Sequence, residues 1–168
     1  MPRIGVTGHR QLPDVPAAEA GVDAALATIE ARFPGELRIL YSLAEGADRL
    51  VVRRVLARPG ASLVAVLPLS KLDYMADFES QQSREEFLTL LGEAETVIEM
   101  PVADSRIGAY EQASRYVVEH SDGLVAVWDG LPARGRGGTA EIVEWARGLG
   151  KPVYRVWTEV DVSELRRK

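Results

Sequence analysis

The sequence of 168 residues contains no cysteine. A chain without cysteine forms no disulfide, has no thiol nucleophile and offers no thiolate to zinc or an iron–sulfur cluster. Histidine is also scarce, because only His9 and His120 occur and they lie far apart in the sequence. Carboxylates would have to supply most of the ligands of any metal ion. We therefore expect neither a disulfide scaffold nor a metal site.

Long apolar runs and an excess of positive charge are missing as well. No window approaches the roughly 20 apolar residues of a membrane span, and the first residues lack the apolar core of a secretory signal. We expect a cytoplasmic protein that does not bind membranes. The net charge is −5, with 25 acidic and 20 basic residues. Because negative charge opposes binding to a phosphate backbone, we do not expect a nucleic-acid partner.

What the sequence does contain fits one globular unit. Hydrophobic residues make up 46% of the chain and charged residues 27%, and the length lies within the roughly 100 to 200 residues of a typical domain. We assign residues 1–158 to a single domain and residues 159–168 to a charged C-terminal tail.

Short apolar runs alternate along the chain with segments of helical spacing. The runs predict strands at 3–7, 37–42, 62–67, 96–100, 123–128 and 153–157, and the spacing predicts helices at 15–33, 46–57, 79–92, 108–120 and 139–148. Segment 63–67 is apolar throughout, as in parallel sheets that helices cover on both faces. The sequence predicts an α/β fold, a Rossmann-like, doubly wound, mainly parallel sheet of about six strands with helices on both faces.

Ligands of such sheets bind where the strands end, and the richest of these loops is 128–141. It holds four glycines, which let backbone amides approach a ligand, and Thr139 is placed to cap the following helix. A helix N-terminus favours phosphate, and Arg134 and Arg136 lie nearby. The spacing matches neither a Walker A loop nor the dinucleotide fingerprint. We predict that the ligand-binding residues of this loop are Trp128, Asp129, Gly130, Gly137, Gly138 and Thr139.

Two earlier loops have a similar character. In the first, Thr7, Gly8, His9 and Arg10 suit an anionic ligand, because a hydroxyl, a free amide and two potential cations follow a strand. In the second, the candidates are Ser42, Glu45, Gly46 and Asp48. There, Gly46 is the expected floor of a ligand site. The acids Glu45 and Asp48 either accept hydrogen bonds from sugar hydroxyls or complement a helix dipole.

The connection 68–78 is longer than the two to six residues typical of a βα loop, which indicates a lid. We predict that Tyr74 stacks on a base, that Asp77 binds a ribose and that Phe78 anchors the segment in the core. Arg106 and Tyr110, at the start of the next helix, are further candidates.

Together these segments resemble a Rossmann-like superfamily. It groups the LONELY GUY cytokinin-activating phosphoribohydrolases, DNA-processing protein A, molybdenum-cofactor carriers and the sensor domains called SLOG. The resemblance covers residues 3–157 and rests on 5–10, 42–48, 122–130 and 137–141. It implies a nucleotide or nucleotide derivative in the crevice, with phosphate over Gly137, Gly138 and Thr139. A SLOG-like sensor or carrier is the first interpretation. It implies a homodimer and a separate effector protein, with no cofactor beyond the ligand itself.

The same resemblance offers an enzymatic alternative, a nucleoside 5′-monophosphate phosphoribohydrolase that cleaves the N-glycosidic bond. Those enzymes carry a Pro-Gly-Gly-x-Gly-Thr-x-x-Glu motif with a catalytic glutamate, and an arginine at a preceding helix start. In this sequence the corresponding catalytic residues would be Glu141 and Arg106, although Glu141 follows Thr139 by two residues instead of three. We expect Glu141 to face the crevice in the first turn of its helix.

Overall fold

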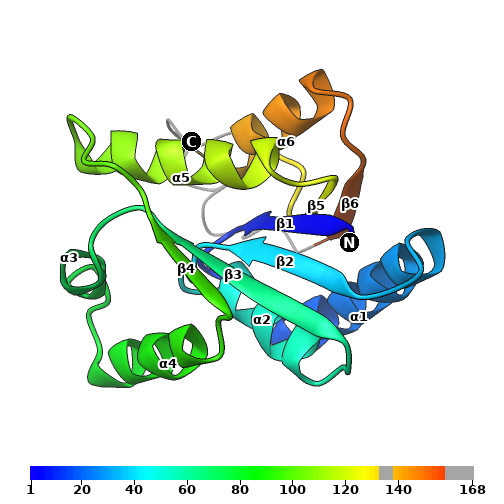
Figure 1. Ribbon diagram of the computed structural model, residues 1–168, viewed down its shortest axis with the longest axis horizontal. Helices are drawn as coiled ribbons and strands as arrows, with labels where there is room; N and C mark the ends of the chain where they lie inside the picture. Colours follow the sequence, from blue (N-terminus) through cyan, green and yellow to red (C-terminus); the bar gives the residue numbers. More distant parts are fainter. Residues whose placement is uncertain (133–137, 158–168) are drawn as a thin grey trace.

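A computed structural model describes residues 1–132 and 138–157 and shows a six-stranded sheet between two layers of helices (Figure 1). The strands are β1 (Arg3–Gly8), β2 (Leu37–Tyr41), β3 (Ala61–Leu67), β4 (Thr96–Glu99), β5 (Gly123–Trp128) and β6 (Val153–Trp157). The helices are α1 (Val15–Arg32), α2 (Ala47–Leu56), α3 (Lys71–Met75), α4 (Gln81–Gly92), α5 (Arg106–Glu119) and α6 (Thr139–Gly148).

The strand order is β4-β3-β2-β1-β5-β6, and every neighbouring pair is parallel. From β1 the chain moves outward to β4, then returns to place β5 on the other side of β1. The strand order therefore reverses between β1 and β5. The predicted α/β, Rossmann-like fold is confirmed, and the sheet is parallel throughout.

Helices cover both faces of the sheet, which explains why its central strands are apolar throughout. Helices α1, α2 and α4 lie on one face, and α5 and α6 lie on the other (Figure 1). In β5, Val125 and Val127 belong to the core of the first face, whereas Leu124 and Ala126 pack with α6 on the second. Each side chain of this strand is buried, because neither face meets water.

Two local predictions differ from the structure. The segment 68–78 contains the short helix α3, which begins after Ser70, whose hydroxyl accepts a hydrogen bond from the Asp73 amide at 3.4 Å. Phe78 is buried in the core as predicted. The prediction that Thr139 caps its helix is wrong, because Gly138 occupies the cap position and Thr139 is already helical.

Within residues 1–132 and 138–157, no helix is long and apolar enough to cross a membrane. The same part of the chain contains no cluster of three or more side chains suited to hold a metal ion.

Candidate functional site

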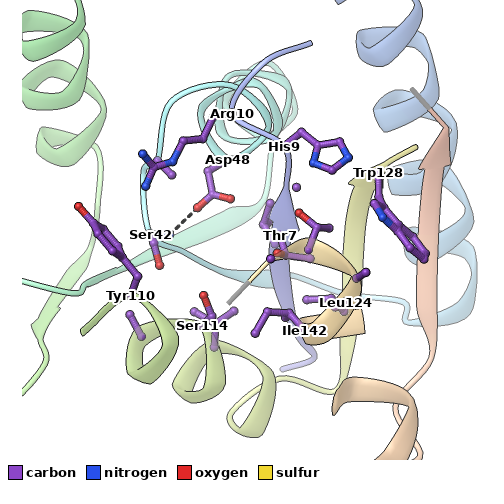
Figure 2. A pocket seen from close by; sticks show the side chains of 18 of the residues that line it. Thr7, His9, Arg10, Ser42, Asp48, Tyr110, Ser114, Leu124, Trp128 and Ile142 are labelled. Atoms are coloured by element: carbon purple, nitrogen blue, oxygen red, sulfur yellow. Dashed lines mark hydrogen bonds between the residues drawn. The ribbon is translucent and has the colours of Figure 1, made fainter. Parts of the chain in front are cut away.

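A pocket of about 550 Å³ opens at the carboxyl ends of the strands, where the strand order reverses. We call it the central pocket (Figure 2). Its lining consists of Val6, Thr7, Gly8, His9 and Arg10 from β1 and its exit, Ser42, Ala44 and Asp48 after β2, Pro68 and Tyr74 after β3, Tyr110, Ala113, Ser114 and Val117 from α5, and Leu124, Trp128, Pro132, Gly138, Thr139, Ala140 and Ile142 from β5, its exit and α6.

The exit of β1 is held on both sides by backbone contacts. The His9 amide donates to the Val127 carbonyl at 3.1 Å, and the His9 carbonyl accepts from the Ala47 amide at 3.0 Å. A Cβ on Gly8 would collide with Ala47 and would lie 2.7 Å from the Val127 oxygen. Glycine at position 8 therefore lets β1, β5 and α2 meet at one point, which fixes the loop at the centre of the pocket.

Gly46 lets the loop after β1 pack closely against the start of α2, and it does not form the predicted floor of the ligand site. It precedes α2 with φ of 83°, and a Cβ there would collide with the Arg10 carbonyl. It lines a smaller groove between α2 and α4, outside the central pocket. Glu45 lines the same groove and accepts a hydrogen bond from the Ser83 hydroxyl at 2.9 Å. The structure therefore separates these two residues from Ser42 and Asp48, which line the central pocket.

Asp48 is a buried carboxylate in the wall of the central pocket, with 6% of its surface exposed. It accepts the Ser42 amide at 2.8 Å, a contact drawn in Figure 2, and the amides of residues 43 and 44 are further donors. Burial raises the pKa of Asp48 from 3.8 to about 6, although these donors and the charge of Arg10 oppose the rise. The Arg10 guanidinium lies 5.3 Å from the centroid of the Tyr110 ring.

A contact between His9 and Asp129 connects the loop after β1 with the loop after β5. The His9 Nε2 lies 3.2 Å from the Asp129 Oδ1, and this oxygen also accepts the Leu131 amide at 3.0 Å. Asp129 is buried and does not line the central pocket, whereas Trp128 does. Gly130, with φ of 82°, packs against the Arg155 side chain, away from the pocket.

The N-terminus of α6 opens into the central pocket. Gly138, Thr139 and Ala140 line it, while the predicted phosphate residue Gly137 lies outside the described residues, as do Arg134 and Arg136.

Glu141 was expected to face the central pocket, but it does not line it. It lines a separate groove between α5 and α6, together with Arg115 and Trp145. The reason is helical geometry, because each residue turns by about 100°. Two residues after the pocket-facing Thr139, a side chain points to the opposite side of the helix.

The segment around α3 forms a wall of the pocket. Tyr74 is 1% exposed, and its ring makes edge-to-face contacts with Phe78 and Phe87, so the ring is held within the core. Asp77 accepts a hydrogen bond from the Arg106 Nε at 2.8 Å, and Arg106 also donates to the Asp73 carbonyl. Neither Asp77 nor Arg106 lines the central pocket.

Sequence reasoning missed the contribution of α5 beyond Tyr110. Ser114 lines the pocket one helical turn after Tyr110, as Figure 2 shows, with Ala113 and Val117 beside it. The buried positions Ala109, Ala113 and Val117 recur every four residues, and this spacing marks the face of the helix that turns toward the sheet. The same spacing in the sequence would have predicted that this helix covers the strand ends.

Comparison with solved structures finds the same fold. DNA processing protein A (DprA) from Streptococcus pneumoniae is 18% identical over 91% of this chain and 49% of that chain, with a TM-score of 0.61. The protein TM1055 is 16% identical over 91% of this chain and 72% of that chain, with a TM-score of 0.55. The chain thus spans about half the length of DprA.

No family model matches the sequence, and no curated protein matches it. At these identities the likeness shows the fold alone. That fold is the Rossmann-like α/β architecture predicted from the sequence, which the comparison confirms.

Proposed function

We propose that this protein binds a nucleotide or nucleotide derivative in the central pocket and acts as a sensor or carrier. The observation that carries the proposal is the position of the pocket at the reversal of strand order, between β1 and β5. Open parallel sheets bind ligands at this point. A volume of about 550 Å³ lies within the range of roughly 300 to 1,000 Å³ typical of small-molecule sites.

The polar groups suggest how such a ligand would lie. The Glu141 and Ile142 amides already donate to the Gly138 carbonyl. Thr139 and Ala140 come before these two residues, in the first turn of the helix. Their amides lie at its positive end, where they suit a phosphate. Arg10 supplies a charged donor from the β1 side, and Ser42, Asp48 and Ser114 offer hydrogen bonds to the sugar and base.

The geometry favours binding over hydrolysis. The phosphoribohydrolase alternative requires Glu141 and Arg106 at the ligand, and both residues lie outside the lining of the central pocket. A sensor also requires a partner that responds to the bound state. The homodimer and the effector protein remain predictions from the resemblance.

The test is a thermal-shift series with AMP, GMP, CMP, UMP, adenosine and ADP-ribose, with chromatography of each mixture for released base. A ligand at a hundred times its Kd stabilises by about 2.7 kcal/mol, which raises Tm by about 5 to 10 °C for a domain of this size. Stabilisation without released base supports a sensor or carrier. Released base means an enzyme, and no shift with any nucleotide refutes the proposal.

Two arginine variants locate the site. Arg10→Ala removes the cation at the pocket and should abolish most of the shift. Arg3→Ala is the matched control, because Arg3 is exposed at the opposite end of the same strand. Equal shifts in the two variants would place the ligand elsewhere.

A further inference from the structure

The pairing of His9 with Asp129 has a role that nucleotide binding alone does not require. His9 lines the central pocket with its side chain 24% exposed, whereas the Asp129 side chain behind it is only 4% exposed. Figure 2 shows the imidazole at the edge of the pocket, between Arg10 and Trp128. A buried carboxylate therefore holds one edge of an imidazole that borders the ligand space.

The two contacts of Nε2 bear on which ring nitrogen carries a proton. Nε2 lies 3.2 Å from the Asp129 carboxylate oxygen and 3.4 Å from the Asp129 amide. It cannot donate to the first and accept from the second at once. The amide can donate to Nε2 only when this nitrogen is bare, so we assign the proton to Nε2 on the ground that its contact with the carboxylate is shorter and charge-assisted. In neutral His9 the other nitrogen, Nδ1, is then an acceptor, and Nδ1 has no hydrogen-bond partner within the described residues.

A bare Nδ1 would repel the oxygen of a phosphate, whereas a protonated Nδ1 would donate to it. Asp129 stabilises the imidazolium from behind, and the N-terminus of α6 borders the same pocket.

We propose that His9 binds the phosphate of the ligand as an imidazolium through Nδ1, an inference that rests on the proposed function. Asp129 is the positioning residue that orients it. Binding then takes up a proton, and the pocket selects a phosphomonoester dianion over a phosphodiester or an uncharged nucleoside.

Other charges near His9 have to be separated from it. Arg10 lies in the same loop, Asp48 faces the pocket from α2, and Arg155 of β6 interacts electrostatically with Asp129. Asp48 has a pKa of about 6, and the second ionisation of a phosphomonoester also falls near pH 6. Between pH 7 and pH 9 both keep their charge, so a change in affinity over that range reports on the imidazole.

The experiment measures AMP binding by calorimetry from pH 7 to pH 9 in buffers of different ionisation heat. The intact protein should take up a proton, and its affinity should fall by up to about tenfold per pH unit. His9→Gln should bind AMP more weakly with a nearly flat pH profile. Asp129→Asn should flatten the profile as well. His120→Gln is the matched control, because His120 stacks on Tyr116 at the end of α5, outside the central pocket.

The chain has only two histidines, so NMR of the imidazole carbons gives two sets of signals, and His120→Gln assigns them. At pH 7.5, AMP should move the His9 signal toward that of an imidazolium, while adenosine and the methyl phosphodiester of AMP should leave it nearly unchanged. AMP binding with the same pH profile in His9→Gln and the intact protein would overturn this inference and leave the proposed function standing. Absence of AMP binding would overturn the inference, and the nucleotide panel would decide the proposed function.

Discussion

Replacing Asp48 by asparagine should make the protein more stable at neutral pH. The pKa of Asp48 is raised from 3.8 to about 6, with burial as the largest cause. A raised pKa means that the folded protein favours the protonated acid. The stabilisation by Asp48 is therefore complete below pH 3.8 and is lost as the pH rises through 6. At about 1.4 kcal/mol per pK unit, ionised Asp48 costs about 3 kcal/mol.

Asparagine removes this cost and keeps an oxygen that can accept the Ser42 amide. A neutral oxygen accepts that hydrogen bond less strongly than a carboxylate, and the asparagine NH2 group cannot accept the amides of residues 43 and 44, so the net gain should be no more than about 1 to 2 kcal/mol at pH 7.5. The gain should shrink toward zero below pH 4. Urea unfolding of both proteins at several pH values measures this directly.

Asp23→Asn is the control of opposite sign, because hydrogen bonds from Arg54 lower the pKa of Asp23. Its contribution is present at neutral pH and is lost in acid, so this variant should be less stable at pH 7.5 and approach the intact protein in acid. A pH-independent difference for Asp48→Asn, or a loss of stability at pH 7.5, would refute the assignment of a destabilising buried carboxylate.

Three further predictions test the placement of the site. Gly46→Ala should lower the free energy of unfolding by at least about 2 kcal/mol in urea, because a Cβ would meet the Arg10 carbonyl at a positive φ. Arg106→Ala should cost less than about 1 kcal/mol and leave the AMP-induced shift in Tm intact, because its ion pair with Asp77 is partly exposed. Glu141→Gln should leave the same shift unchanged, since Glu141 lines the groove between α5 and α6; a lost shift would place Glu141 at the ligand.

The order and type of the elements were predictable because the period of the apolar residues is a local property. Residues 123–128 form a buried strand where the sequence is continuously apolar, and 139–148 form a helix where the spacing is helical. Helix α3 was missed, because its five residues are too few to display a helical period. Its stability comes from Tyr74, which packs against rings brought to it from α4 and α5.

The site was predictable only as far as topology determines it. Parallel strands deliver their carboxyl ends to one edge of the sheet, so loops after β1, β2 and β5 had to meet. Which side chains face the ligand depends on the rotation of each helix about its axis. If α6 began one residue earlier or later, another residue than Thr139 would stand at the start of the helix. The apolar spacing of α6 reports the face that packs on β5, but it does not report which residues at the start of the helix border the pocket.

The contact between His9 and Asp129 depends still more on the tertiary structure, because it joins residues 120 positions apart. It exists because β1 and β5 are neighbours in register, with Gly8 opposite Val127. Neither loop alone contains the chemistry of a carboxylate-oriented imidazole. The pairing of β1 with β5 therefore does more than complete the sheet, since it assembles the group that we propose recognises the phosphate. A substitution at Gly8 that displaces Val127 should accordingly weaken the response of AMP affinity to pH, even though it changes no titratable residue.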